Sequence, residues 1–311
     1  MGILSHGKVT TVLQYFTDRF DDYWHILYPI ILKGKRKEDE YLYFYDISRK
    51  ALDYNGKFNE DGIYLFYGYD GSYHLHALEL SQYSLACWLA WKKTDNTAWL
   101  DKALLHCDWL VKNQESDGAW RIEHKNPSYK DLPSPWPSAL TQGLAISSLI
   151  RAYKYTCNEE YVTSAKKACE FLEIDIANNG VKRIFSLNKI FGFIYEEYPR
   201  NELNGVLNGH LSAIFGIYEL SLIDNSYNKM FENNLKNLKK ILPLFDLGYW
   251  SYYSLDGNID SGFYHRLIVK QLKVLSEIDS EFEKYYMKFY RQQENKYFAV
   301  KAFIQKVRYK L

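Results

Sequence analysis

The sequence predicts a mainly α-helical protein built as an α/α toroid, an incomplete or (α/α)6-like barrel of helix pairs with short β-hairpins in its rim loops. Two observations predict this fold. Glycines at positions 62, 118, 180 and 248 lie in similar short segments, separated by 56, 62 and 68 residues. The stretches between these segments carry apolar residues at helical spacing, two runs per stretch. A period near 60 residues exceeds the usual solenoid unit and suits a helix pair with one long loop.

The helix pairs are expected in chain order between these segments. Pro137 and Asn158 mark two of the helix starts, since proline fits just before a helix and asparagine caps one. Glycines near the starts of the inner helices allow close helix approach, and they stand at positions 143, 205, 209 and 216. The expected helical ranges are 78–91 with 99–110, 138–157 with 159–177, 207–222 with 227–242, and a pair beginning near 263 and ending in the charged helix from 281.

The remaining segments are a hairpin and an irregular N-terminal part. Residues 181–186 and 190–195 alternate apolar and polar side chains, which predicts a β-hairpin in that rim loop. Residues 1–70 are expected to be an extension that packs on the toroid, and residues 71–311 the toroidal catalytic domain. Residues 41–45 read equally well as a strand or as the start of an extra helix.

Composition excludes some partners and favours others. A net charge of +1 gives no basic field for nucleic acid or an anionic membrane, and no apolar run approaches the roughly 20 residues of a membrane span. The 29 Tyr and 8 Trp residues favour flat sugar-binding faces, although Tyr in place of Phe in the core explains them equally well. No signal peptide is visible near Met1.

The four cysteines predict a reducing compartment. They fall inside helical patterns without metal-ligand spacing, at positions 87, 107, 157 and 169. We therefore expect buried free thiols and a cytoplasmic, bacterial protein.

Several blocks in the second half of the chain resemble one enzyme family when they are read in order. The blocks span residues 135–147, 180–185, 195–199, 206–209, 242–246 with Tyr253, and 264–272. Pro135-Trp136-Pro137-Ser138-Ala139-Leu140-Thr141-Gln142-Gly143 opens the series, and Tyr195-Glu196-Glu197-Tyr198-Pro199 lies at its centre. In sequence and spacing they resemble glucuronyl C5-epimerases, the heparosan and heparan sulfate enzymes, over roughly residues 71–290. The resemblance also implies the toroid.

The resemblance implies an isomerase that needs no cofactor or metal. The expected reaction is epimerisation at C5 of D-glucuronyl residues to L-iduronyl residues in a heparosan-like or other uronic-acid polysaccharide. Carried over by position, the catalytic residues are Glu197, Tyr198, Tyr253 and Tyr264. The expected substrate-binding residues are Tyr73, Trp136, Gln142, Lys182, Arg183, Arg200, Asn208, His265 and Arg266.

These residue types fit the chemistry. Epimerisation removes a weakly acidic proton next to a carboxylate and returns one from the opposite face, so the developing enediolate needs preorganised donors. A tyrosine, with an ordinary pKa of about 10, can act on one face if neighbours stabilise its phenolate. A glutamate can act on the other if burial raises its pKa.

Each assignment has a structural alternative. Tyr253 could be one packing tyrosine among many, and Glu197 an exposed turn acid. Trp136 could stack on a sugar or pack in the rim, and Asn208 could cap a helix or contact the ligand. We interpret His74 and His76 as structural or sugar-contacting residues rather than metal ligands.

Two departures from the family pattern stand out. The family has an arginine three positions after the tyrosine that matches Tyr253, and here that position is Asp256. We hypothesise that Arg200, Arg183 or Arg266 supplies the missing charge. Animal enzymes also carry a β-sheet region before the helical domain, whereas only about 70 residues precede the resemblance here.

Two other functions remain open alternatives. A uronate lyase would form the same carbanion on the same fold and then expel the C4 oxygen. A non-catalytic acidic-glycan-binding protein would keep the cleft without the chemistry. The expected partner in all three cases is an acidic polysaccharide, with a homodimer as an open alternative to a monomer.

Overall fold

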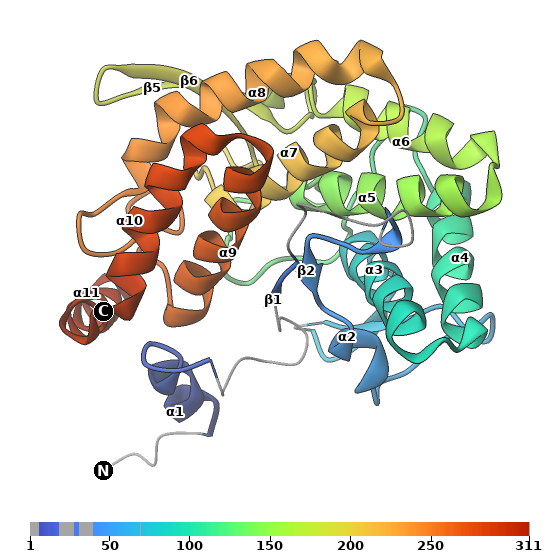
Figure 1. The fold of residues 1–311 in the computed structure, drawn as a ribbon, viewed down its shortest axis with the longest axis horizontal. Coiled ribbons are helices and arrows are strands. Elements are labelled where there is room, and N and C mark those ends of the chain that lie inside the picture. The colour runs from blue at the N-terminus through green and yellow to red at the C-terminus, as the bar shows by residue number, and fades with distance from the viewer. Residues whose placement is uncertain (1–5, 19–27, 31–39, 69, 311) are drawn as a thin grey trace.

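The computed structural model describes residues 6–18, 28–30, 40–68 and 70–310 (Figure 1). The predicted mainly helical class is confirmed. The helices are α1 (His6–Leu13), α2 (Arg49–Leu52), α3 (Ala77–Thr94), α4 (Thr97–Lys112), α5 (Ala139–Thr156), α6 (Glu159–Phe171), α7 (Leu207–Ser221), α8 (Asn228–Ile241), α9 (Gly262–Ile278), α10 (Glu283–Glu294) and α11 (Lys296–Lys310). Short antiparallel strand pairs join β1 (Tyr28–Pro29) to β2 (Tyr45–Asp46), β3 (Phe66–Tyr67) to β4 (Tyr73–His74), and β5 (Lys182–Leu187) to β6 (Ile190–Tyr195).

The helices from α3 to α10 pack as the predicted pairs. Helix α3 packs on α4, α5 on α6, α7 on α8 and α9 on α10, while α3, α5, α7 and α9 also contact one another in succession (Figure 1). We call these four the inner helices. The predicted hairpin is β5–β6, and helix α6 ends earlier than expected, at Phe171. Closure of these pairs into a toroid stays a prediction.

Polar caps and small residues explain where the helices begin and how closely they pack. The Asn158 side chain accepts a hydrogen bond from the Glu160 amide at 3.0 Å, so the predicted cap of α6 is confirmed and contributes about 1 kcal/mol. A Cβ on Gly143 of α5 would lie 2.3 Å from the Ser212 carbonyl oxygen of α7. Only glycine permits this approach, as the sequence predicted for Gly143.

The described part of residues 41–67 packs into the same hydrophobic core as the inner helices. Phe44 stacks on Phe215 of α7 with ring centroids 4.6 Å apart. Arg151 of α5 pairs with Glu219 of α7 at 2.7 Å and donates to the Leu42 carbonyl, also at 2.7 Å. The undecided stretch 41–45 is therefore neither a long strand nor a helix, because it ends in the two-residue strand β2.

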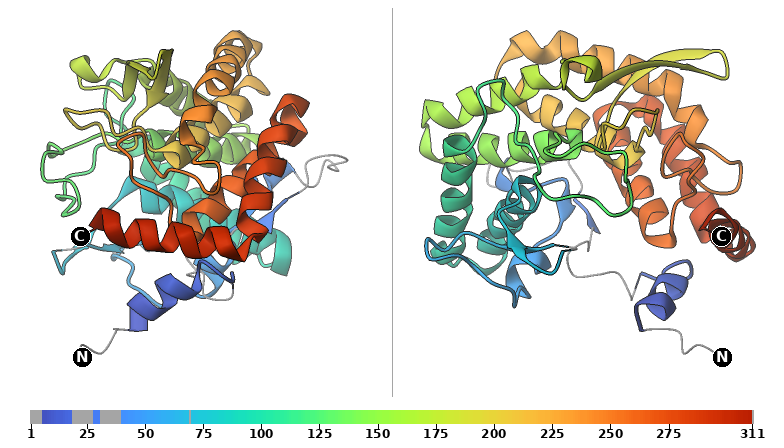
Figure 2. Two further views of the ribbon diagram at one scale, coloured as in Figure 1. Left: turned by 90° about the vertical axis from the view of Figure 1, so that its left-hand side faces the viewer. Right: turned by 180° about the vertical axis from the view of Figure 1, so that it is seen from behind.

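A second, smaller hydrophobic cluster lies beside the start of α9, where Gly262 packs against Gln14 and Tyr15. Tyr15, just after α1, stacks on Trp250 at 6.0 Å and meets Phe303 of α11 edge-on at 5.7 Å. Both views in Figure 2 place α1 and α11 on the same side of the molecule, so the two ends of the described chain lie near each other.

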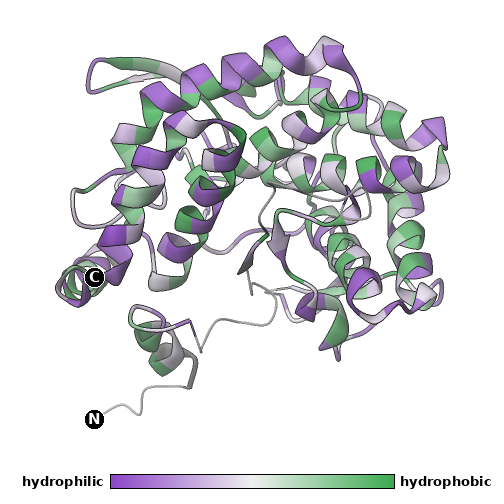
Figure 3. Ribbon diagram, viewed as in Figure 1, coloured by the Kyte–Doolittle hydropathy of each residue, from purple (hydrophilic) through white to green (hydrophobic). Residues whose placement is uncertain are grey.

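Hydropathy follows the arrangement of the helices. The inner helices α5 and α7 bury most of their side chains, whereas α8 and α10 show hydrophilic outer faces (Figure 3). None of the helices in the described ranges has the length and apolar character that crossing a membrane requires. The four cysteines are free thiols, but the prediction that all are buried is wrong for Cys157, which is exposed at the C-cap of α5.

Candidate active site

A cavity of about 520 Å³ lies where the inner helices begin. Each inner helix contributes a residue from its first turn to the lining: Glu79 of α3, Leu140 of α5, Asn208 of α7 and Tyr264 of α9. A helix N-terminus carries roughly half a positive charge from its unpaired backbone amides. The arrangement of the inner helices therefore favours a negatively charged group in the cavity.

Formal positive charge is scarce on the cavity wall. Among the described residues that line the cavity, Lys50 is the one lysine or arginine. Its ammonium lies 2.6 Å from a carboxylate oxygen of Glu79 and also donates to Gln82. Lys50 is 1% exposed, so this pair is buried at its cationic end.

Glu197 reaches the cavity from the turn that follows the β5–β6 hairpin. Consecutive side chains of an extended segment point to opposite sides. Glu196 points inward, where it accepts hydrogen bonds from Arg183 Nε at 2.7 Å and the Gly205 amide at 2.8 Å. Glu197 therefore faces the cavity. A Cβ on Gly209 of α7 would lie 2.7 Å from the Glu197 Cβ, so this glycine makes room for the carboxylate.

The surroundings of Glu197 bring its titration close to neutral pH. The residue is 4% exposed, and burial raises its pKa to about 7. Hydrogen bonds from Tyr198 and Asn208 counteract part of that increase, the latter from Nδ2 at 3.4 Å. At neutral pH the carboxyl group is thus present in both protonation states, as a general acid or base requires.

Tyrosine side chains surround this carboxylate. Tyr198 hydrogen-bonds to Glu197, and the ring of Tyr264 lies 4.8 Å from that of Tyr253. Burial, followed by the charge of Glu197, raises the pKa of both Tyr198 and Tyr253. The structure brings Glu197, Tyr198, Tyr253 and Tyr264 together from three separate segments, with Tyr253 set behind Tyr264 rather than on the cavity wall.

A fourth phenol, which the sequence did not single out, belongs to this group. The ring of Tyr129 lies 4.6 Å from that of Tyr198, and Arg200 lies over its outer face at 4.9 Å. Burial and then Glu197 raise the Tyr129 pKa. Tyr129 lies in a loop outside the blocks that resemble the family, so no sequence signal separated it from the other tyrosines.

The three arginines proposed to replace the family cation do not line the cavity. Arg183 pairs with Glu196, and Arg266 donates to the Gln14 carbonyl. Arg200 pairs with Asp131 at 2.8 Å and reaches Asp256 at 3.7 Å. These assignments need correction: each guanidinium already has a structural partner at or behind the rim, which the order of residues along the chain did not reveal.

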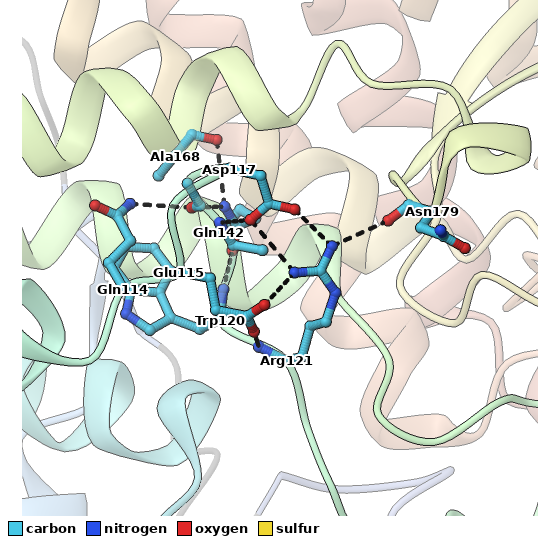
Figure 4. A network of polar contacts seen from close by, with 10 residues as sticks. Gln114, Glu115, Asp117, Trp120, Arg121, Gln142, Ala168 and Asn179 are labelled. Carbon is cyan, nitrogen blue, oxygen red and sulfur yellow. Dashed lines mark hydrogen bonds and ion pairs between the residues drawn. The ribbon is translucent and has the colours of Figure 1, made fainter.

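Gln142 also needs correction as a substrate-binding residue. It is fully buried, and Figure 4 shows its amide between neighbouring backbone segments. Its amide nitrogen Nε2 donates to the Gly118 carbonyl at 2.9 Å, and its Oε1 accepts from the Trp120 amide at 3.3 Å. Arg121 beside it pairs with Glu115 and Asp117. This network fixes the loop after α4 and leaves no group for a ligand.

His265 and Lys182 likewise have structural partners away from the cavity. His265 stacks on Trp250 at 3.8 Å and contacts the Ser251 hydroxyl at 2.6 Å. Lys182 pairs with Glu173 at 2.5 Å and lies over the Phe193 ring at 4.7 Å. Neither residue lines the cavity, so both are removed from the substrate-binding set.

Three of the expected substrate-binding residues do line the cavity. Tyr73 is 40% exposed at the mouth. Trp136 is 3% exposed and packs 5.5 Å from the Tyr198 ring, so it supports that phenol more than it displays its own face. Asn208 is no helix cap, because its Nδ2 donates to Glu197 and its Oδ1 accepts from Gln271 at 3.3 Å.

Within the described ranges, His, Cys, Asp and Glu do not form a group of three or more that could hold a metal ion. The lining instead offers carboxylate, phenol and amide groups. This set can move protons and donate hydrogen bonds to an anionic sugar.

Comparisons with known proteins agree with the chemistry of this lining. A family model described as the D-glucuronyl C5-epimerase C-terminus matches residues 113–295. The D-glucuronyl C5-epimerase of Caenorhabditis elegans is 34% identical over 199 residues, which cover 56% of this chain and 32% of that enzyme. An uncharacterized protein of Methanocaldococcus jannaschii is 24% identical over 207 residues, 62% of this chain and 66% of that protein.

This chain therefore spans about a third of the nematode enzyme's length and just under two thirds of the archaeal protein's. The family match covers Glu197, Tyr198, Tyr253 and Tyr264 together with Tyr129. By that match, the chain belongs to the family of the D-glucuronyl C5-epimerase C-terminus.

Proposed function

We propose that this protein epimerises C5 of D-glucuronyl residues to L-iduronyl residues within a heparosan-like or other uronic-acid polysaccharide. The observation that carries the proposal is the buried carboxyl group of Glu197, with a pKa of about 7, among phenols on the wall of a cavity. The family match and the nematode relative support the same reaction.

The reaction needs two proton-transfer groups on opposite faces of one sugar. Glu197 and Tyr198 form one pair, joined by a hydrogen bond, and Tyr264 with Tyr253 forms the other, whose rings are in edge-to-face contact. One pair removes the C5 proton, and the electron pair of the C5–H bond moves into the carboxyl group as an enediolate. The other pair returns a proton to the opposite face. Protons and electrons balance without a co-reactant, so no cofactor is required by the proposal.

The charge of the substrate carboxylate is offset without an arginine. The N-terminal ends of the inner helices meet at the cavity, and each supplies a partial positive charge. The Asn208 amide and the phenols add hydrogen-bond donors for the enediolate. Asp256 occupies the position of the family's arginine. Its carboxylate accepts hydrogen bonds from Ser254 and Asn204. Helix dipoles rather than an arginine would therefore stabilise the negative charge in this site.

Incubation of heparosan with the protein in heavy water tests the proposal against its rivals. Deuterium at C5 in chains of unchanged length, with new iduronyl signals in the proton NMR spectrum, is the expected result. An unsaturated product that absorbs ultraviolet light would identify a lyase. Binding of heparosan with neither signal would identify a non-catalytic glycan-binding protein. Heat-inactivated protein serves as the control.

A further inference from the structure

Helix α11 carries a row of exposed apolar and aromatic residues on the side that faces away from the protein. Four residues follow one another at steps of three, four and three positions, which places them on one side of the helix: Tyr297, Val300, Ile304 and Val307. They are 72%, 43%, 46% and 42% exposed, in that order. The left view of Figure 2 shows α11 at the front of the molecule, where none of the described elements crosses it. We call this row the α11 stripe.

The opposite side of α11 fixes the helix to the protein. Ala299 and Ala302 are buried in the hydrophobic cluster around Trp250. Lys306 donates a hydrogen bond from Nζ to the Asn258 side chain at 2.6 Å. These contacts hold the helix in one orientation. Packing within the described chain therefore accounts for one apolar side of α11 and leaves the α11 stripe largely uncovered.

Positive charge lies on both sides of the α11 stripe. Of the fifteen residues of α11, five are lysine or arginine and none is acidic. On a helix of 3.6 residues per turn, Lys296 lies beside one edge of the stripe, and Lys301 and Arg308 lie beside the other. All three residues are exposed. The net charge of +1 for the whole chain therefore conceals one strongly cationic helix.

We propose that the α11 stripe docks on an anionic membrane surface, with the helix lying in the plane of the interface. Aliphatic side chains can enter the boundary between lipid headgroups and acyl chains, and a tyrosine fits the headgroup level. The flanking cations would lie against anionic headgroups. The described residues that line the cavity do not include any from α11, so this surface is separate from the candidate active site and does not depend on the proposed activity.

Two other occupants fit the α11 stripe less well. A second copy of α11 would bring the cations against like charges, because the helix contains no acidic residue. An acidic polysaccharide would meet the cations, but Val300 and Ile304 are aliphatic and offer no flat face to a sugar ring. An anionic membrane uses both the apolar residues and the charges beside them.

Flotation of the 311-residue chain with lipid vesicles tests the proposal. The vesicles contain either equal parts of phosphatidylglycerol and phosphatidylcholine, or phosphatidylcholine alone. We expect the wild type to float with the anionic vesicles and not with the neutral ones. The Lys296→Gln/Arg308→Gln variant should bind the anionic vesicles roughly 25-fold more weakly, because each cation near such a surface contributes about a factor of five.

A second variant removes the apolar part of the surface. Val300→Gln/Ile304→Gln should weaken binding to the anionic vesicles at least about tenfold, because two side chains can no longer bury apolar surface in the lipid. Both positions are exposed in the free protein. The melting temperature should therefore stay within a few degrees of the wild type, which separates a loss of docking from misfolding.

Two variants on other helices serve as matched controls. Lys236→Gln/Lys240→Gln removes two exposed cations from α8, on which the described residues include no large exposed apolar side chain. Leu222→Gln removes a leucine that is 59% exposed at the C-cap of α7. Both variants should bind the anionic vesicles within about twofold of the wild type.

Three results would overturn the proposal: no flotation with the anionic vesicles, equal flotation with both kinds of vesicle, or equal losses in the α11 variants and their controls. A fourth would assign the α11 stripe to a second copy of the chain instead. It is a dimer in analytical ultracentrifugation that Val300→Gln/Ile304→Gln abolishes, together with no binding to vesicles.

Discussion

The two walls of the cavity differ in what they offer a ligand. The wall within residues 124–271 carries Glu197 with a pKa of about 7 and the phenols around it. The N-terminal wall, formed by the lining residues of the segment 43–82, carries the Lys50–Glu79 ion pair and His76, whose pKa burial lowers to about 4. The first lies inside the family match and the second outside it. Under the proposed function, the proton-transfer groups therefore all lie within the matched range.

The largest expected effect removes the proton-transfer group of the first wall. The Glu197→Gln variant should reduce deuterium incorporation at C5 by about 10²–10⁴-fold, because the amide can neither accept nor supply the proton. The rate is measured on heparosan in heavy water. The Michaelis constant should change far less. If His76→Phe reduced kcat as much as Glu197→Gln does, the proton-transfer role could not be assigned to the first wall alone.

The next effect concerns the stability of the N-terminal wall. Lys50→Met should lower the free energy of unfolding by about 2–4 kcal/mol, since it removes the buried ion pair between Lys50 and Glu79. Chemical denaturation measures the loss, and the double variant Lys50→Met/Glu79→Gln should recover much of it.

Lys93→Met is the matched control for Lys50. Lys93 also joins the N-terminal segment to α3, through Asp46, but its side chain is 47% exposed. Its loss should cost no more than about 1 kcal/mol. Equal losses from the two lysine variants would show that the Lys50–Glu79 pair is not buried as described.

The raised pKa of Glu197 on the first wall should make the stability of the protein depend on pH. The pKa of Glu197 is raised from 4.5 to about 7, so folding favours its protonated form. This contribution to stability is complete below pH 4.5 and is lost as the pH rises through about 7.

The Glu197→Gln variant does not titrate at this position. Its stability relative to the wild type should therefore rise between pH 4.5 and 7, by at most about 3 kcal/mol. Thermal unfolding across this pH range measures the difference. A constant difference would contradict the raised pKa. Glu79→Gln provides the comparison from the second wall.

The smallest effect tests a residue that belongs to neither wall. Gln142→Leu should lower the free energy of unfolding by about 1–3 kcal/mol, because the Gly118 carbonyl and the Trp120 amide lose a buried partner. The Michaelis constant for heparosan should stay within about twofold of the wild type. A larger rise in that constant with unchanged stability would return Gln142 to the substrate-binding residues.

The sequence was informative where local rules decide the structure. Apolar spacing located the helix pairs, Asn158 marked a cap, and the alternation of residues 181–195 located the hairpin. The family resemblance identified Glu197 and its phenols, which the fold brings together. Such features depend on residues close in the chain or on a recognised motif.

The remaining features depend on contacts between distant segments. Lys50 reaches the cavity because residues 41–67 pack into the helical core, and no local sequence pattern predicts that packing. Gln142 lies in the block 135–147 that resembles the family, yet its side chain is buried and its amide hydrogen-bonds to the Gly118 carbonyl. Arg200 is close in sequence to Glu197 but pairs with Asp131 from another loop.

The most direct test of the central claim is a crystal structure of the Glu197→Gln variant with a heparosan tetrasaccharide. We expect the C5 atom of one hexuronate to lie about 3–3.5 Å from the side chain at position 197 or from its partner Tyr198, with the Tyr264 hydroxyl on the opposite face. A tetrasaccharide bound outside the cavity, or with its hexuronate C5 facing none of these groups, would contradict the account.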